Sequence, residues 1–92
     1  MSDPVSLKKA LNVARYRLAA NVPGDALDWL KKSESRWGKS GDYHYLVAQC
    51  YSVLDDLGEM KSHLTTALKL NSNLLQQALD DPCFDSLFGQ FM

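Results

Sequence analysis

The segment 41-GDYHYLVAQCYSVLDDLGEMKSHLTTALKLNS-72 decides the fold, because its pattern predicts two amphipathic helices that pack closely against each other. In the first predicted helix Ala48 precedes Tyr51 by one turn, and in the second Leu64 precedes Ala67. A weaker copy of the pattern lies 34 residues upstream. The corresponding positions are Val13 and Val47, Ala14 and Ala48, Ala26 and Met60, Leu30 and Leu64, and Ser33 and Ala67. A repeat of this length is typical of a helical solenoid, which presents its surface to other proteins.

Helix start and stop signals divide the rest of the chain into similar units. The start signals are Asp3-Pro4, Pro23-Gly24-Asp25, Ser40-Gly41-Asp42, Asp56, Ser72 and Asp81-Pro82. They predict helices to about residue 20, from 25 to about 37, from 42 to 54, from 57 to 70 and from 74 to 79, with a last helix after 82. The turns are short and join antiparallel neighbours, and no strand pattern competes. The sequence therefore predicts one all-α domain over residues 1–92, with five to six helices stacked as antiparallel hairpins.

The composition argues against several classes of function. With 10 basic and 11 acidic side chains the formal net charge is −1, so the chain has no overall attraction to nucleic acid or anionic lipid. The longest apolar stretch, residues 45–54, is far shorter than the roughly 20 residues that a membrane helix needs. The first residues lack the basic and apolar segments of a secretory signal. We therefore expect a cytoplasmic protein with no membrane span.

No residue pattern predicts catalysis, a metal site or a cofactor. His44 and His63 fall on different predicted helices and lack the spacing of zinc ligands. The acidic pairs at 55–56 and 80–81 sit at helix ends, where carboxylates cap free amides. Cys50 and Cys83 match no metal or redox spacing, so reduced thiols are expected, with a disulfide as the alternative. The chain is expected not to be an enzyme.

Residues 41–74 resemble the tetratricopeptide repeat, a helix pair of 34 residues that stacks into a right-handed superhelix. Ala48 matches the family's small residue at the closest helix contact, Tyr51 its aromatic residue one turn later, and Ala67 the alanine of its second helix. The chain departs from the family pattern at His44, Asp55, Met60 and Ser72. Residues 7–40 match less well, and residues 75–92 resemble the helices that often follow the last repeat. The resemblance implies two degenerate repeats, at about 7–40 and 41–74, and a C-terminal cap.

The same resemblance implies a non-enzymatic adaptor or scaffold, because the family binds a peptide or a partner's helix on a concave face lined by the first helix of each repeat. Position by position, this face would be lined by Lys8, Leu11, Asn12, Arg15 and Leu18, and by Asp42, Tyr45, Gln49, Ser52 and Val53. Tyr45 and Arg15 are the expected anchors, since tyrosine and arginine supply much of the binding energy at interfaces. The alternative is that both are ordinary solvated side chains.

The C-terminal residues carry an apolar stripe with two interpretations. Phe84, Leu87, Phe88 and Phe91 recur at steps of three and four residues, so they share one face of a predicted helix. The stripe either covers the end of the repeat stack or forms an exposed patch that holds a homodimer together. The second interpretation predicts a self-associating structural subunit or a secretion-type chaperone. The expected partners are thus proteins or peptides, bound by a monomer or a homodimer.

Overall fold

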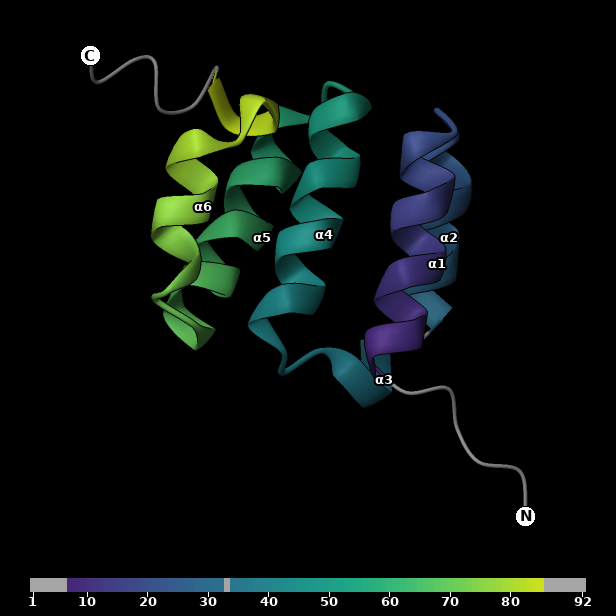
Figure 1. The fold of residues 1–92 in the computed structure, drawn as a ribbon, viewed down its shortest axis with the longest axis horizontal. Helices are drawn as coiled ribbons and strands as arrows, with labels where there is room; N and C mark the ends of the chain where they lie inside the picture. Colours follow the sequence, from purple (N-terminus) through teal and green to yellow (C-terminus); the bar gives the residue numbers. More distant parts are fainter. Residues whose placement is uncertain (1–6, 33, 86–92) are drawn as a thin grey trace.

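The computed structural model describes residues 7–32 and 34–85, and these residues form helices without any strand (Figure 1). The elements are α1 (Leu7–Ala19), α2 (Pro23–Lys32), α3 (Glu34–Trp37), α4 (Gly41–Val53), α5 (Leu57–Leu70), α6 (Leu74–Asp80) and the short 3-10 helix η1 (Pro82–Phe84). For this part of the chain the predicted all-α class is confirmed. None of these helices is long and apolar enough to cross a bilayer.

Side-chain caps fix several helix ends where the sequence placed them. The Ser40 hydroxyl accepts the Tyr43 N–H at 3.3 Å at the start of α4, and an Asp56 carboxylate oxygen accepts the Glu59 N–H at 3.3 Å at the start of α5. Such bonds satisfy amides that a helix leaves free in its first turn. The limits predicted for the helix at 57–70 are therefore confirmed. The predicted start at Asp3-Pro4 lies outside the described residues.

Three expectations for the helices need correction or narrowing. The predicted cap at Ser72 is wrong, because Asn73 occupies the N-cap position of α6 and makes no side-chain capping bond. The helix predicted up to residue 37 is divided between α2 and α3, which lie on either side of residue 33, outside the described residues. The helix predicted after Pro82 begins as the single 3-10 turn of η1, and its continuation beyond residue 85 also lies outside them.

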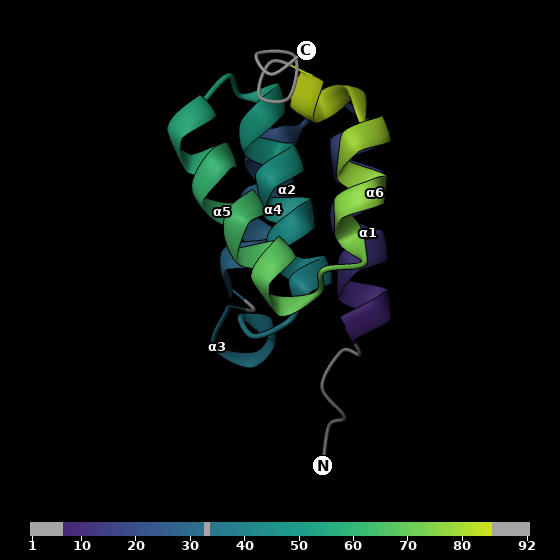
Figure 2. The same cartoon turned by 90° about the vertical axis from the view of Figure 1, so that its left-hand side faces the viewer.

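The helices form two antiparallel hairpins, α1 with α2 and α4 with α5, followed by α6 and η1. The turns need residues in the left-handed region, and Asn21 (φ 64°) and Asp55 (φ 63°) supply them. Asn and Asp tolerate this conformation better than most side chains because they can bond to nearby backbone. α4 lies at the centre. It packs against α1 and α2 of the first hairpin, against α5 of its own hairpin, and against α6 and η1. In Figure 2, α1 and α6 lie on one side of α4, and α5 lies on the opposite side of α4.

The core has two clusters, and α4 contributes to both. The first cluster joins α1 and α2 to α4 and consists of Leu11, Ala14, Ala26, Leu27, Leu30, Tyr43, Leu46, Val47 and Cys50. The second joins α4 to α5, α6 and η1 and consists of Tyr45, Ala48, Met60, Leu64, Ala67, Leu74, Ala78 and Phe84. The small residues of the sequence pattern, Ala14, Ala48 and Ala67, are all fully buried. They therefore lie in the core, as their spacing predicted.

Candidate functional site

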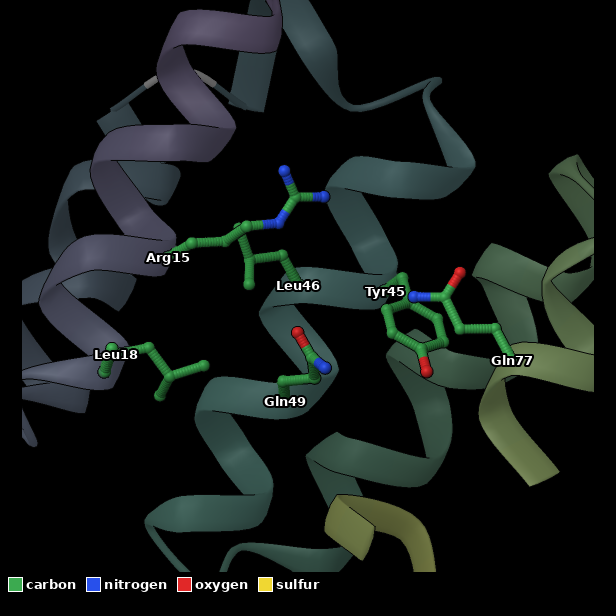
Figure 3. Close-up of a pocket in the computed structure, with 7 residues that line it drawn as sticks. Arg15, Leu18, Tyr45, Leu46, Gln49 and Gln77 are labelled. Carbon is green, nitrogen blue, oxygen red and sulfur yellow. The ribbon is translucent and has the colours of Figure 1, made fainter. Parts of the chain in front are cut away.

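A groove of about 280 Å³ lies between α1, α4 and α6 (Figure 3). It is lined by Arg15, Leu18 and Ala19 from α1, by Tyr45, Leu46 and Gln49 from α4, and by Gln77 from α6. Arg15 is the one charged side chain among these seven lining residues. Small binding sites commonly combine apolar walls with a few polar groups, as this one does. The groove is therefore the candidate functional site.

The groove gathers four residues of the predicted concave face, namely Arg15, Leu18, Tyr45 and Gln49. The other six lie elsewhere. Leu11 is 4% exposed and belongs to the first core cluster, and Ser52 donates a hydrogen bond to the backbone oxygen of Cys83. The remaining four, Lys8, Asn12, Asp42 and Val53, are exposed and do not line the groove. The predicted face thus contributes to the groove mainly at its middle turns.

Tyr45 forms a wall of the groove and not a protruding anchor. Its side chain is only 4% exposed, and its ring packs edge-on against Phe84 with the ring centroids 5.3 Å apart. The Tyr45 hydroxyl donates a hydrogen bond of 2.7 Å to Asp81. Burial, and next the contact with the Asp81 carboxylate, raise the pKa of Tyr45 above its ordinary value. The ring predicted to contact a partner is therefore engaged inside the chain.

Asp81 accepts three hydrogen bonds, and two of them hold the C-terminal helices against α4. It accepts from the Tyr45 hydroxyl and the Gln49 amide, each at 2.7 Å, and from the Cys83 N–H at 2.9 Å. Burial by itself would raise the pKa of Asp81, but these bonds favour the carboxylate and bring the pKa below its ordinary value. We call these three bonds, together with the bond from Ser52 to the Cys83 carbonyl oxygen, the Asp81 latch. Its members are Tyr45, Gln49, Ser52, Asp81 and Cys83. The sequence predicted Asp81 as a cap and missed its bonds to α4.

Arg15 and Gln77 face each other across the groove from α1 and α6, and both are exposed (Figure 3). The described contact of the Arg15 guanidinium is a 3.3 Å hydrogen bond to Asn12, one turn earlier on α1. None of the seven described lining residues carries a carboxylate. The sequence did not place Gln77 at the site, because α6 was interpreted only as part of a cap. Its position depends on how α6 folds back along α4.

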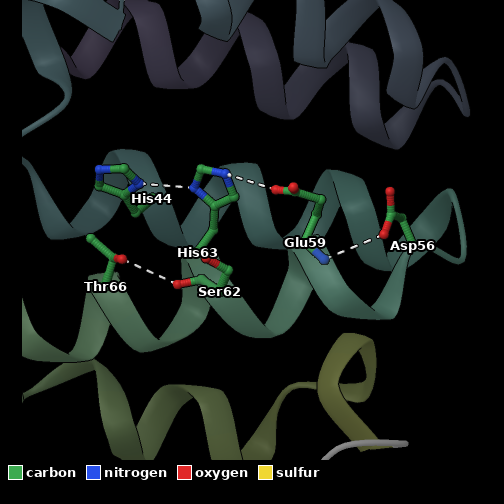
Figure 4. A network of polar contacts seen from close by, with 6 residues as sticks. All are labelled: His44, Asp56, Glu59, Ser62, His63 and Thr66. Carbon is green, nitrogen blue, oxygen red and sulfur yellow. Dashed lines mark hydrogen bonds and ion pairs between the residues drawn. The ribbon is translucent and has the colours of Figure 1, made fainter.

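A second polar cluster joins α4 to α5 on the face of this hairpin that points away from α6 (Figure 4). The Nδ1 atoms of His44 and His63 lie 3.0 Å apart, and His44 Nε2 lies 2.6 Å from the Gly38 carbonyl oxygen. A carbonyl only accepts, so His44 Nε2 carries a hydrogen. When both rings are neutral, His63 must therefore donate its Nδ1 hydrogen to His44. The two rings are also stacked, with centroids 5.3 Å apart.

The histidine pair has room for one additional proton. Protonation of His63 Nε2 keeps the Nδ1 contact and creates an ion pair with Glu59, whose carboxylate oxygen is 3.7 Å away. Protonating both rings would direct two N–H groups at each other. Burial, and next the neighbouring His44, lower the pKa of His63, while Glu59 and Glu34 oppose this shift and Lys31 adds to it. The sequence did not predict this pairing, since His44 lies nine residues before the end of α4 and His63 only six residues after the start of α5.

The remaining reactive groups offer little chemistry. Cys50 and Cys83 are free thiols, and burial as the main cause raises the pKa of Cys50 to about 12 and that of Cys83 to about 11. Neutral thiols of this kind are poor nucleophiles and poor metal ligands. Within residues 7–32 and 34–85, no three His, Cys, Asp or Glu side chains gather so as to hold a metal ion. Phe84, expected in a dimer contact or a lid, is fully buried in the second cluster, and Phe88 and Phe91 lie outside the described residues.

Comparisons with protein-family models, with curated proteins and with solved structures find no match to this chain. The resemblance to the tetratricopeptide repeat therefore stays a prediction from the residues of the sequence.

Proposed function

We propose that this protein is a non-enzymatic interaction module whose groove between α1, α4 and α6 binds a peptide or a helix of a partner protein. The observation that carries the proposal is the groove itself, which combines apolar side chains with amides and one exposed arginine. In this proposal the two hairpins act as degenerate tetratricopeptide repeats in a short solenoid. α6 takes the place that the next repeat would have along the concave face.

The groove lining suits a peptide better than a small metabolite. Gln49 and Gln77 present amides, which both donate and accept hydrogen bonds and so match the repeating N–H and C=O groups of a peptide backbone. Leu18, Ala19 and Leu46 offer apolar surface to a side chain. The exposed Arg15 is a candidate hot spot, because its planar guanidinium binds a carboxylate with two parallel hydrogen bonds.

The Asp81 latch supports the proposal by fixing one wall of the groove. It ties the segment that follows α6 to α4 through side chains of Tyr45, Gln49 and Ser52. A groove whose walls are held before the partner arrives loses less conformational entropy on binding. The latch thus favours a preformed site over one that orders around its partner.

Selection from a displayed peptide library, followed by affinity measurement on the purified chain, tests this function. Peptides that bind in the groove should lose at least about tenfold in affinity on Arg15→Glu, equivalent to about 1.4 kcal/mol, and should shift the amide resonances of α1, α4 and α6. The matched control is Lys61→Glu, which makes the same charge change on the exposed face of α5. Equal losses in both variants, or peptides that bind Arg15→Glu unchanged, would contradict the proposal. Tyr45 is unsuitable as a probe because it is a core residue.

A further inference from the structure

The net charge of −1 conceals a strong separation of charge between the two halves of the chain. Residues 7–40 carry eight lysines and arginines and three acidic side chains, which gives +5. Residues 41–85 carry two lysines and seven acidic side chains, which gives −5. The first hairpin is therefore as positive as the remainder of the described chain is negative.

The basic side chains concentrate at one end of the first hairpin. The start of α1, the end of α2, α3 and the turn before α4 lie together at the lower right of Figure 1 and at the bottom of Figure 2. These segments carry the basic corner, which consists of Lys8, Lys9, Lys31, Lys32, Arg36 and Lys39. Glu34 and Asp42 are the acidic side chains in the same segments, so the basic corner keeps a clear excess of positive charge.

The acidic side chains concentrate at the opposite end of the second half. The α4–α5 turn with the first turn of α5, and the end of α6 with η1, lie together at the top of both views. These segments carry the acidic corner, which consists of the exposed side chains Asp55, Asp56, Glu59, Asp80 and Asp85. The two corners lie diagonally across the molecule in Figure 1.

We propose that the basic corner is a docking surface for the acidic corner of a second copy of this chain. The two corners differ in sign, so a contact between like corners is repulsive and the favoured contact joins opposite corners of the two copies. A long polyanion such as nucleic acid is a poorer fit, because the half of the chain that carries −5 adjoins the basic half and repels it. A second copy offers a surface of similar charge and opposite sign.

This contact uses surfaces outside the groove and does not depend on the function proposed above. Exposed ion pairs are individually weak and strongly screened. Charges act over about 30 Å at 0.01 M salt but over only about 3 Å at 1 M. The association is therefore concentration-dependent at low ionic strength and absent at high ionic strength.

Sedimentation equilibrium over about a hundredfold range of protein concentration tests the proposal. At about 0.01 M salt the wild-type average mass should rise with concentration, and at about 1 M it should stay that of a monomer. Two double variants reverse charges at the corners: Lys32→Glu/Lys39→Glu in the basic corner, and Asp80→Lys/Asp85→Lys in the acidic corner. All four of these side chains are exposed. Each double variant alone should remain monomeric, whereas an equimolar mixture should associate, because the mixture restores one basic and one intact acidic corner.

The control is Lys61→Glu/Lys69→Glu, which gives the same change in net charge as Lys32→Glu/Lys39→Glu at exposed positions on α5 that belong to neither corner. It should still associate, and circular dichroism should show equal helix content in all variants. The proposal is overturned if the wild-type chain stays monomeric at every concentration at low salt. This includes the case in which the mass rises only after a DNA duplex is added. Association that survives 1 M salt, or a mixture of the two double variants that stays monomeric, overturns it as well.

Discussion

The two hairpins differ in how firmly their helices are held. α4 buries eight of its residues because it packs on both sides, whereas α1 at the edge buries three and leaves most of its polar side chains in water. Polar bonds follow the same division: Asp81 and the histidine pair join α4 to the C-terminal elements and to α5, while α1 is joined to α2 by the Trp29 indole N–H donating to the Ala10 carbonyl at 2.9 Å. The comparison teaches that the central helix supplies the rigid floor of the groove and the edge helix supplies its accessible side chains.

The largest effect is expected at the Asp81 latch. Tyr45→Phe keeps the ring against Phe84 but removes the hydroxyl donor, and Asp81→Asn removes the charge. Hydrogen bonds to charged groups contribute about 1.5–3 kcal/mol, so each variant should lower the free energy of unfolding by that order in urea titrations at neutral pH. Asp80→Asn, at the exposed neighbouring residue, is the control and should change it little.

The latch also predicts a dependence on pH. The pKa of Asp81 is lowered in the folded state, so its stabilisation is fully present above the ordinary pKa of an aspartate and is lost as the pH falls through the lower folded value. Asp81→Asn should therefore lose less stability on acidification than the wild type. Parallel acid dependence in the two proteins would show that Asp81 does not hold the C-terminal helices in this way.

A smaller effect is expected from adding one methyl group at a glycine in each hairpin. A Cβ on Gly41 would lie 2.9 Å from the Asn71 Cβ and 3.0 Å from the Ala67 carbonyl oxygen, whereas a Cβ on Gly24 would meet nothing within 4 Å. Gly41→Ala should therefore destabilise the protein by about 1–3 kcal/mol through overpacking between α4 and α5. Gly24→Ala should stabilise it by about 0.4–1 kcal/mol by restricting the unfolded chain. Thermal unfolding of the two variants measures both changes in stability. If both variants lose stability to a similar extent, the predicted difference between the two hairpins is wrong.

The smallest effect is expected from the histidine pair. The pKa of His63 is lowered on folding, so the unfolded chain binds more protons just below the ordinary histidine pKa, and stability should fall as the pH drops through this range. His63→Phe keeps an aromatic ring between Tyr51 and His44 but removes the Nδ1 donor, which should cost about 1 kcal/mol at neutral pH and flatten the pH dependence. Urea titrations between about pH 7 and pH 5 measure it.

Glu59→Gln is the matched variant for the histidine pair. Glu59 opposes the lowering of the His63 pKa, so removing its charge should lower that pKa further and make stability fall more steeply with acidification. An NMR titration of the His63 ring follows the pKa directly. A steeper slope in His63→Phe than in the wild type would contradict the assignment of the pH dependence to this pair.

Much of the helical framework could be predicted from local chemistry. The caps at Ser40 and Asp56, and the acceptance of the Cys83 amide by Asp81, follow from side chains that compete for free backbone amides within three residues. The alanine spacing assigned Ala14, Ala48 and Ala67 to the core correctly, because all three are fully buried. Such features depend on residues near in sequence, so a pattern records them.

The groove was predicted less well, because its shape depends on contacts that are long-range in sequence. Repeat positions named Arg15, Leu18, Tyr45 and Gln49, but Gln77 enters only because α6 folds back beside α4. The same contact buries Tyr45, whose hydroxyl reaches across 36 residues to Asp81. A repeat pattern assigns side chains to a helix face. It carries no information about another element, here α6, that covers part of that face.

The sequence by itself determined the helical class, most of the helix limits, the small residues at the helix contacts and the separation of positive from negative charge along the chain. Only the tertiary structure decided which polar side chains remain exposed, which of them meet, and where the charges gather in space. The physical reason is range. Capping and helical periodicity act within one or two turns, whereas the histidine pair and the Asp81 latch form when residues 19 to 36 positions apart meet. The groove joins residues still farther apart, from Arg15 on α1 to Gln77 on α6.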